Sequence, residues 1–319
     1  RMPCYSPLKG WRDEETGGIK FRRENARAEM EVGCGQCLGC RLDRSRMWAV
    51  RIIHESSLHE VDEGNCFITL TYDDEHVPED WSLRKSDFQK FMKRLRKAHP
   101  QRIRFYHVGE YGEKCKHCPT YSDKTVDDCE YCNVGRPHYH AVLFNCSFND
   151  LVPVGERNGV VYFTSARLQR LWPYGFVQVG EVNFESAAYI ARYVLKKRNG
   201  QLADDHYMLI DDHGVASWVL PEYSTMSRRP GIGREWYEKF KADLFPSDEV
   251  PVPGSGVFKK VPRYYAEILE SEDEGLYEEV KKLRLLFRLE HADDYTSARL
   301  MDKYRVKKAQ TSLLKEGMT

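Results

Sequence analysis

The chain has 319 residues, enough for roughly two domains at the usual size of about 150 residues each. Hydrophobic residues make up 41% of it and charged residues 31%, which excludes a wholly disordered chain, a collagen-like chain and a bundle of membrane helices. No apolar run reaches the roughly eighteen residues of a spanning helix, and no signal-peptide core is present, so we expect a soluble, intracellular protein with no membrane partner. The 49 basic and 49 acidic residues cancel, and this neutral total by itself argues against a nucleic-acid-binding protein.

Residues 1–60 are predicted to form a cysteine-rich N-terminal region that ends in a helix. Cys34, Cys37 and Cys40 follow one another at three-residue intervals, and Cys4 would complete a tetrahedron if the chain loops back. We interpret this set as a possible zinc site. An iron–sulfur cluster would also fit such thiolates, but it ranks below zinc because nothing else in the sequence indicates redox work.

The central region, 61–200, alternates short strands with amphipathic helices. Runs rich in β-branched and aromatic residues predict strands, and apolar residues at helical spacing predict helices. The order suits an α+β domain in which helices pack against one antiparallel sheet. The strands are expected over 66–72, 104–109, 137–144 and 175–180, and the helices over 86–99, 164–171 and 186–197.

An insertion at 113–135 carries two CxxC pairs, Cys115 with Cys118 and Cys129 with Cys132. Each CxxC turn presents two thiolates on one side, so two such turns predict a structural Cys4 zinc site. The polar loop between the pairs is unable to build its own core, and the metal would supply its folding energy. The alternative interpretation is four free cysteines on a long surface loop.

Two histidines begin the strand that follows the insertion. Residues two apart on a strand point to the same side, so His138 and His140 present their imidazoles together while Tyr139 faces away. Two co-facing imidazoles are a potential pair of metal ligands.

A third metal ligand is expected from the end of the preceding strand. If that strand pairs with the histidine strand, Glu110 lies near both imidazoles, and a carboxylate with two imidazoles suits Mg²⁺ or Mn²⁺. Glu113 is a competing candidate, and His107 is a further residue that could reach the site.

The helix over 186–197 carries Tyr189 and Tyr193, one turn apart on one face, together with Arg192, Lys196 and Lys197. Aromatic residues at this spacing usually belong to a core. Nearby cations and a metal-bound phosphate, however, would favour a phenolate, which is what a covalent nucleophile requires.

The C-terminal region, 201–319, is predicted to be mainly helical, and it is highly charged from about residue 263. Near its start a glycine-containing turn precedes a helix and offers Arg228, Arg229 and Arg234 as possible phosphate contacts. Residues 84–104 carry nine basic residues and one acidic residue, so the neutral total hides a local excess of positive charge. We expect a basic groove beside the active site.

Three motifs together resemble those of rolling-circle replication initiators, the HUH endonucleases. They are the strand Phe67–Thr71, the HxH pair and the YxxxYxxK helix. The segments MPCYSPL, CGQCLGCRL and SRRPGIGR are similar to the replication proteins of gokushovirus-type microviruses, and the likeness covers roughly residues 2–240. The CxxC…CxxC insertion departs from a minimal member of this family.

The resemblance implies an HUH-type, ferredoxin-like fold and a site-specific single-strand DNA nickase. A metal held by His138, His140 and Glu110 would polarise the scissile phosphate. One of the two tyrosines would form a 5′-phosphotyrosyl link and leave a 3′-OH that primes a host polymerase, and the other would act after one round of replication. Lys196 and Lys197 would steady the phosphate or the phenolate; which tyrosine cuts first stays open.

The partners implied by this resemblance are a single-stranded DNA origin and host replication proteins such as a helicase and a polymerase, in the cytoplasm of a bacterial host. The competing interpretation is a zinc-dependent nucleic-acid-binding module without catalysis, in which the histidines and tyrosines are structural. A scaffolding viral protein is disfavoured, because it needs none of the three motifs.

Overall fold

The computed structural model describes residues 4–13, 18–21, 26–60, 63–112, 135–157, 160–193, 207–210, 214 and 216–317. The chain divides into two compact units. One comprises Arg1–Met47, Ala242–Val250 and Phe258–Thr319, and the other comprises Trp48–Lys241 and Pro251–Val257. Within the described residues, no helix is both long enough and apolar enough to cross a membrane.

The second unit is built on a seven-stranded antiparallel sheet in the order β12-β5-β6-β4-β9-β8-β7. The α+β architecture and four of its strands, β4, β5, β6 and β9, are as predicted. The β7–β8 hairpin and the edge strand β12, which comes after residue 200, were not predicted. The strands are β4 (Asn65–Thr71), β5 (Arg104–Tyr111), β6 (Pro137–Phe144), β7 (Leu151–Arg157), β8 (Val160–Ser165), β9 (Val177–Gly180) and β12 (Tyr223–Met226).

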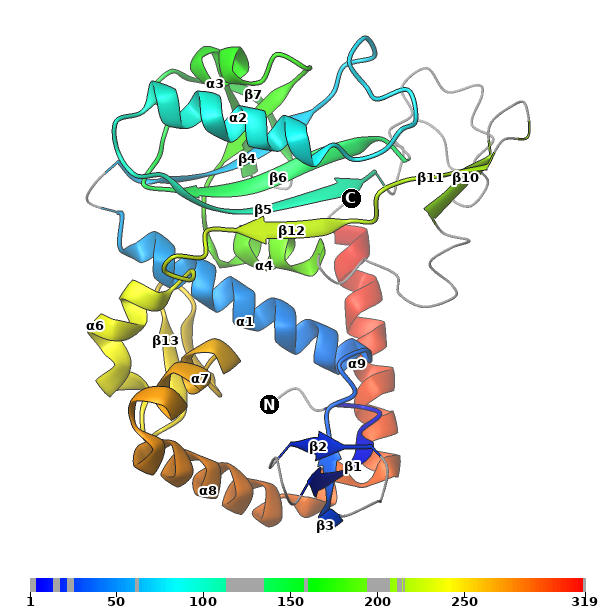
Figure 1. The fold of residues 1–319 in the computed structure, drawn as a ribbon, viewed down its shortest axis with the longest axis vertical. Coiled ribbons are helices and arrows are strands. Elements are labelled where there is room, and N and C mark those ends of the chain that lie inside the picture. The colour runs from blue at the N-terminus through cyan, green and yellow to red at the C-terminus, as the bar shows by residue number, and fades with distance from the viewer. Residues whose placement is uncertain are drawn as a thin grey trace. The chain divides into compact units, whose positions relative to one another are not determined.

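Helices cover both faces of this sheet. Figure 1 shows α2 on one side of it and α4 on the other. Both follow the predicted segments, because their apolar residues recur at helical spacing. The helices of this unit are the C-terminal part of α1 (Leu38–Ser57), α2 (Lys85–Ala98), α3 (Ala166–Leu171), α4 (Phe184–Tyr193) and most of α6 (Arg234–Leu244).

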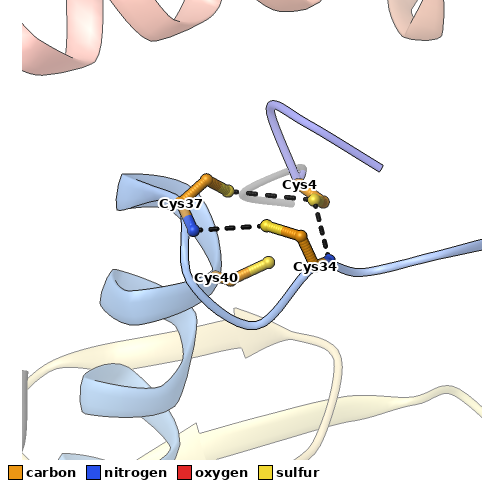
Figure 2. Close-up of side chains that lie close together, drawn as sticks. All are labelled: Cys4, Cys34, Cys37 and Cys40. Atoms are coloured by element: carbon orange, nitrogen blue, oxygen red, sulfur yellow. Dashed lines mark hydrogen bonds between the residues drawn. The ribbon is translucent and has the colours of Figure 1, made fainter. Parts of the chain in front are cut away.

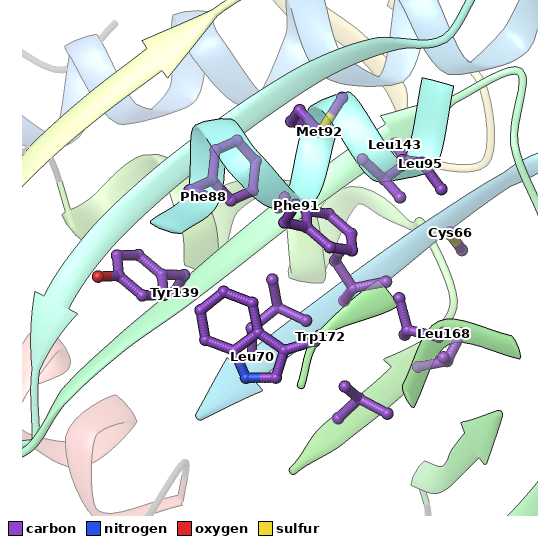
Figure 3. Close-up of a cluster of buried hydrophobic side chains, with 14 of the residues drawn as sticks. Cys66, Leu70, Phe88, Phe91, Met92, Leu95, Tyr139, Leu143, Leu168 and Trp172 are labelled. Carbon is purple, nitrogen blue, oxygen red and sulfur yellow. The ribbon is translucent and has the colours of Figure 1, made fainter. Parts of the chain in front are cut away.

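The main core lies between α2 and the sheet (Figure 3). The buried stripe of α2, namely Phe88, Phe91, Met92 and Leu95, packs in one cluster with Trp172 and with side chains from alternate positions of β4 and β6. Burial of each such side chain stabilises the fold by about 1.5–3 kcal/mol. The odd-numbered residues of β6 face this core, and its even-numbered residues are left for the opposite face.

The β5–β6 pair is closed at its open end by backbone hydrogen bonds. The N–H of Gly112 donates to the carbonyl of Arg136 at 3.0 Å, and the N–H of Gly135 donates to the carbonyl of Gly112 at 2.7 Å. The ladder therefore ends just before the insertion. Most of the insertion, including Glu113, Cys115, Cys118, Cys129 and Cys132, lies outside the described residues, so its predicted zinc site stays a prediction.

The first unit contains a three-stranded sheet and the C-terminal helices. The N-terminal region was predicted as a loop and a helix, and the sheet β2-β1-β3 was missed because its strands are charged and partly exposed. The helices beyond residue 263 are as predicted. The elements are β1 (Leu8–Asp13), β2 (Ile19–Lys20), β3 (Ala26–Val32), α7 (Arg263–Glu272), α8 (Glu274–Glu290), η1 (Ala292–Tyr295) and α9 (Ser297–Gly317).

Two short hairpins complete the described structure: β10 (Met208–Ile210) with β11 (Ala216–Trp218), and β13 (Glu249–Val252) with β14 (Gly256–Lys259).

Candidate functional site

Three potential metal ligands meet on the face of the sheet opposite α2. Glu110 on β5 is the register partner of His138 on β6, and His140 follows two residues later on the same face. The Nε2 atoms of His138 and His140 lie 2.8 Å and 2.9 Å from the same oxygen, Oε1 of Glu110. All three ligand atoms lie within 4.8 Å of one another. The structure thus brings together the three residues expected from the sequence.

His107, the further ligand candidate, points the other way. It stands three residues from Glu110 on β5, so its side chain lies on the α2 face. There its ring stacks on Phe88 with centroids 3.4 Å apart, and its Nδ1 pairs with Oγ1 of Thr225 at 2.9 Å. His107 is therefore not part of the ligand cluster.

Both histidines are oriented through their second ring nitrogen. Nδ1 of His140 lies 2.9 Å from Oγ1 of Thr69, which faces it across the β4–β6 ladder. Nδ1 of His138 donates to the backbone carbonyl of Arg136 at 3.1 Å. Protons held on Nδ1 leave the Nε2 lone pairs available, which is the usual arrangement of histidines that bind a metal.

Electrostatics keep Glu110 ionised although it is almost fully buried. Burial alone would raise its pKa, but the charges and hydrogen bonds of His138 and His140 outweigh burial and hold the pKa of Glu110 well below its usual range. The donor set is therefore one buried carboxylate with two imidazoles, a combination that suits a divalent cation.

Tyr189 is the predicted nucleophile that lies beside this cluster. It is half-buried on α4, and its ring stands edge-on to His140, with centroids 5.5 Å apart. Phe67 on β4 packs against both rings, at 5.5 Å from His140 and 6.3 Å from Tyr189. Tyr193 is the last residue of α4, one turn further on, and its side chain lies outside the described residues, as do Lys196 and Lys197.

Four cysteines form a second cluster, in the first unit (Figure 2). Their sulfur atoms lie within 4.8 Å of one another, and Sγ of Cys4 is 3.8 Å from Sγ of Cys37. Sulfurs that are each 2.3 Å from a zinc ion at tetrahedral angles are about 3.8 Å apart. The N-terminal segment thus loops back to Cys34, Cys37 and Cys40 as the sequence analysis requires.

Backbone N–H groups point at the thiols of this cluster. The N–H of Cys34 donates to Sγ of Cys4 at 3.3 Å, and the N–H of Cys37 donates to Sγ of Cys34 at 3.2 Å. Burial opposes ionisation of Cys37, but hydrogen bonds from the N–H groups of Cys40 and Tyr5 help to lower the pKa of this thiol to about 7. Such N–H groups stabilise a thiolate, the form that binds a metal.

The basic helix α2 does not lie beside the ligand cluster, contrary to expectation. Its apolar side packs on the Tyr139 face of the sheet, whereas Glu110, His138 and His140 are on the opposite face. The sequence pattern gave the charge of the helix but not the face of the sheet that the helix covers.

Thr69 and Phe67 are site residues that sequence reasoning missed. Both belong to a predicted strand, but their role depends on the pairing of β4 with β6, which places Thr69 opposite His140. The alternation of Phe67, Thr69 and Thr71 on one face of β4 was the available signal, since polar and aromatic residues there indicate a face that is not plain core.

Comparison with known proteins places this site inside a matched region. Residues 65–118 and 125–198 match the family model of replication-associated proteins of the ORF2 group. The chain is 31% identical over 280 residues to replication-associated protein VP4 of Bdellovibrio phage phiMH2K, which covers 83% of the chain and 76% of that protein. It is 32% identical over 308 residues to replication-associated protein ORF2 of Spiroplasma virus 4, covering 89% and 86%.

A shorter match, 32% identical over 173 residues, is to replication-associated protein ORF4 of Chlamydia phage 1, and it covers 51% of the chain and 38% of that protein. No solved structure gives a significant match to the chain. The residues that match the family model include Glu110, His138, His140 and Tyr189.

Proposed function

The chain belongs to the family of phage replication-associated proteins, and from this membership we propose that it nicks and rejoins single-stranded DNA at a specific origin to start and end rolling-circle replication. The observation that supports this proposal is the convergence of Glu110, His138 and His140 beside the ring of Tyr189. A non-catalytic module needs no such convergence of two imidazoles, a buried carboxylate and a phenol.

Glu110, His138 and His140 would hold Mg²⁺ or Mn²⁺. The bound cation would draw charge from the scissile phosphate and leave it open to attack. Thr69 and the carbonyl of Arg136 keep the two imidazoles in the orientation needed for binding.

Tyr189 is the proposed nucleophile. Its phenolic oxygen bonds to phosphorus, the bond from phosphorus to the 3′ oxygen breaks, and that oxygen leaves as a 3′-OH while the phenolic proton passes to water. The DNA stays attached through a 5′-phosphotyrosine. Attack by a 3′-OH on this link reverses the exchange and frees the tyrosine, so the bond energy is conserved and no nucleotide cofactor is required.

Tyr193 would cut the regenerated origin after one round of replication, and Lys196 and Lys197 would steady the phosphate. The free 3′-OH is the primer that a host polymerase extends, with a host helicase opening the duplex, in the bacterial cytoplasm. These roles rest on the position of the four residues on or directly after α4.

The test uses single-stranded oligonucleotides that tile the cognate genome, incubated with the protein in Mn²⁺. An oligonucleotide labelled at its 3′ end should become covalently attached to the protein, and the 5′-labelled fragment should be released with an extendable 3′-OH. We expect Tyr189→Phe to reduce adduct formation at least about a hundredfold, and the double variant Tyr189→Phe/Tyr193→Phe to abolish it.

The control is Tyr162→Phe, on β8 of the same sheet, which should form the adduct normally. An adduct formed by the double variant would exclude these nucleophiles. Nicking by a His138→Ala/His140→Ala variant would exclude the metal site. Origin binding without any strand cleavage by the wild-type protein would favour the zinc-dependent binding module instead.

We also propose that Cys4, Cys34, Cys37 and Cys40 hold a structural zinc ion. The spacing of the sulfurs and the N–H groups aimed at them support this assignment. A Cys4 site leaves no open coordination position, so this zinc would fix the N-terminal segment to the start of α1 and take no part in the reaction.

A further inference from the structure

An arginine-lined groove lies at the end of β5 far from the metal ligands. It has a volume of about 550 Å³ and is lined by Arg96, Arg102, Arg228 and Arg229 together with His99 and neighbouring residues. We shall call it the arginine groove. We propose that it binds the phosphodiester backbone of the origin DNA outside the nicked position, an inference that rests on the proposed function.

Three segments build the groove. The end of α2 contributes Arg96, the segment before β5 contributes Arg102, and the segment after β12 contributes Arg228 and Arg229. The last segment is fixed to β5, since the N–H of Ser227 donates to the carbonyl of Phe105 at 2.9 Å.

Arg102 also joins two walls of the groove. Its Nη2 donates to the carbonyl of Arg229 at 2.6 Å. The arginines are therefore brought together by the fold and are not merely near one another in the sequence.

The groove carries uncompensated positive charge. The four arginines are exposed, and none of them has an acidic partner among the residues that the structure describes. The acidic group nearest in this region, Glu55, is buried and pairs with Arg104 at the base of the groove. That pair neutralises the charge of Arg104 and leaves the charges of the rim.

The base of the groove also holds unused hydrogen-bond donors. Arg104 is 4% exposed, and its Nη1 and Nη2 have no hydrogen-bond partner among the described residues. Buried guanidinium nitrogens normally find an acceptor. A phosphate oxygen or a water molecule that fills the groove would supply one.

Phosphate is the ligand that this chemistry favours. Arginine presents a planar fork that matches phosphate oxygens in pairs, and four such groups around one open groove suit a chain of phosphates. The exposed, basic lining is typical of contacts that position DNA without reading its sequence. The groove thus accounts for the positive segment over 84–104, which the catalytic face of the sheet does not use.

The length of β5 sets a minimum distance between the two sites. Arg104 at the groove and Glu110 at the metal ligands are the ends of a six-residue span, or about 20 Å at the rise of a strand. This equals about six nucleotides at the spacing of a duplex strand. The DNA that reaches the groove therefore lies at least about six nucleotides from the scissile phosphate.

The test compares the full-length protein with the double variant Arg96→Gln/Arg228→Gln, in the presence of EDTA so that no cleavage occurs. Binding of fluorescent origin oligonucleotides is measured by anisotropy at several salt concentrations. Removal of two phosphate contacts should weaken binding and reduce the slope of log K against log salt by about 1.4 for single strands. An oligonucleotide that extends fewer than about six nucleotides from the nick should bind both proteins equally.

Arg170→Gln is the matched control, because Arg170 is an exposed arginine on α3 that does not line the groove. Equal affinity and equal slope of the double variant and the wild-type protein on long oligonucleotides would overturn the proposal. Duplex and single-stranded arms of the same length show which form occupies the groove, and loss with either supports it. Because binding is measured without cleavage, groove dependence in a protein that never nicks would sink only the proposed activity.

Discussion

Thr69 acts on the metal ligands from a neighbouring strand. Its Oγ1 lies 2.9 Å from Nδ1 of His140, and outer hydrogen bonds of this kind fix the tautomer and direction of a ligand. We expect Thr69→Val, which keeps the shape but removes the hydroxyl, to weaken Mn²⁺ binding by about 10- to 100-fold. Isothermal titration calorimetry measures this loss.

Thr71→Val is the matched control on the same strand. The hydroxyl of Thr71 donates to the carbonyl of Phe176 and touches no ligand, so its removal should leave Mn²⁺ affinity unchanged. Equal Mn²⁺ affinities of the Thr69→Val and wild-type proteins would show that His140 needs no such support.

His54 makes the stability of the fold depend on pH. It is fully buried, its ring stacks on Trp236 at 3.4 Å, and its Nε2 pairs with the carbonyl of Pro251 at 2.8 Å. Burial lowers the pKa of His54 from 6.5 to about 4. Between these values the unfolded chain binds a proton that the folded chain does not, so stability is lost as the pH falls.

The contribution of His54 to the free energy of unfolding should fall by about 2 kcal/mol between pH 7.5 and pH 5. Urea titrations at both pH values measure it. His54→Gln keeps an N–H donor but does not titrate, so its stability should decrease by that much less than the wild-type stability does. The same decrease in both proteins would contradict this origin of the pH dependence.

Alternation along a strand explains which site residues the sequence could predict. His138, His140 and Glu110 follow from the two-residue period and from one assumed pairing of adjacent strands. The same period excludes His107, which the sequence analysis retained. Thr69 was out of reach, because its role requires the pairing of β4 with β6, about 70 residues apart, which no local pattern encodes.

At the scale of elements, Gly175 controls the junction of β4 and β9. Its φ is +149°, and a Cβ there would stand 2.3 Å from the backbone nitrogen of Asp73. The flanking Phe176 exchanges two backbone hydrogen bonds with Thr71, both of 3.0 Å, so neither chain can retreat without losing them. Only glycine fits this close approach.

Gly175→Ala should therefore lower the free energy of unfolding by more than about 1 kcal/mol, as measured by urea denaturation. Gly155→Ala, on β7, is the control, since a Cβ at Gly155 meets nothing within 4 Å. Similar small effects of the two substitutions would mean that the junction relaxes at low cost.

Element prediction succeeded where an apolar pattern was strong and failed where it was weak. The stripe of α2 and the buried strands β4, β5 and β6 have clear periods, because each packs on the core. The edge strand β12 has four half-buried residues and no such period. The strand β7 is exposed through most of its length, so its formation depends on its pairing with β8.

At the scale of the whole molecule, composition conceals how charge is distributed. The formal net charge is zero, yet exposed arginines gather at the arginine groove while acids are abundant elsewhere. The sequence analysis predicted the basic segment but placed the groove beside the active site. The location failed because a helical pattern states which side of a helix is buried and not which face of a sheet buries it.

Zinc and the catalytic metal should be separable, since their ligands lie in different units. If both cysteine sets bind zinc, the wild-type protein should contain two equivalents by elemental analysis. Cys37→Ser should retain one, lower the melting temperature, and leave Mn²⁺ affinity unchanged, because structural zinc contributes folding energy and no catalytic ligand.

Cys146→Ala serves as the control, because this thiol is buried in the core and belongs to neither set, so both zinc equivalents should remain. Two equivalents in the Cys37→Ser protein would remove the N-terminal set from the list of metal sites.

The hydrogen bonds between Gly112, Gly135 and Arg136 have an evolutionary consequence. They complete the β5–β6 ladder before the insertion begins, so a change in the length of 113–134 shifts neither Glu110 nor His138 in register. A doubling of such a loop costs only about 0.6 kcal/mol of closure entropy. The match to the family model is interrupted at 119–124, within this segment. Here related phages can diverge, and an engineer can graft a new module, while the reaction chemistry is inherited intact.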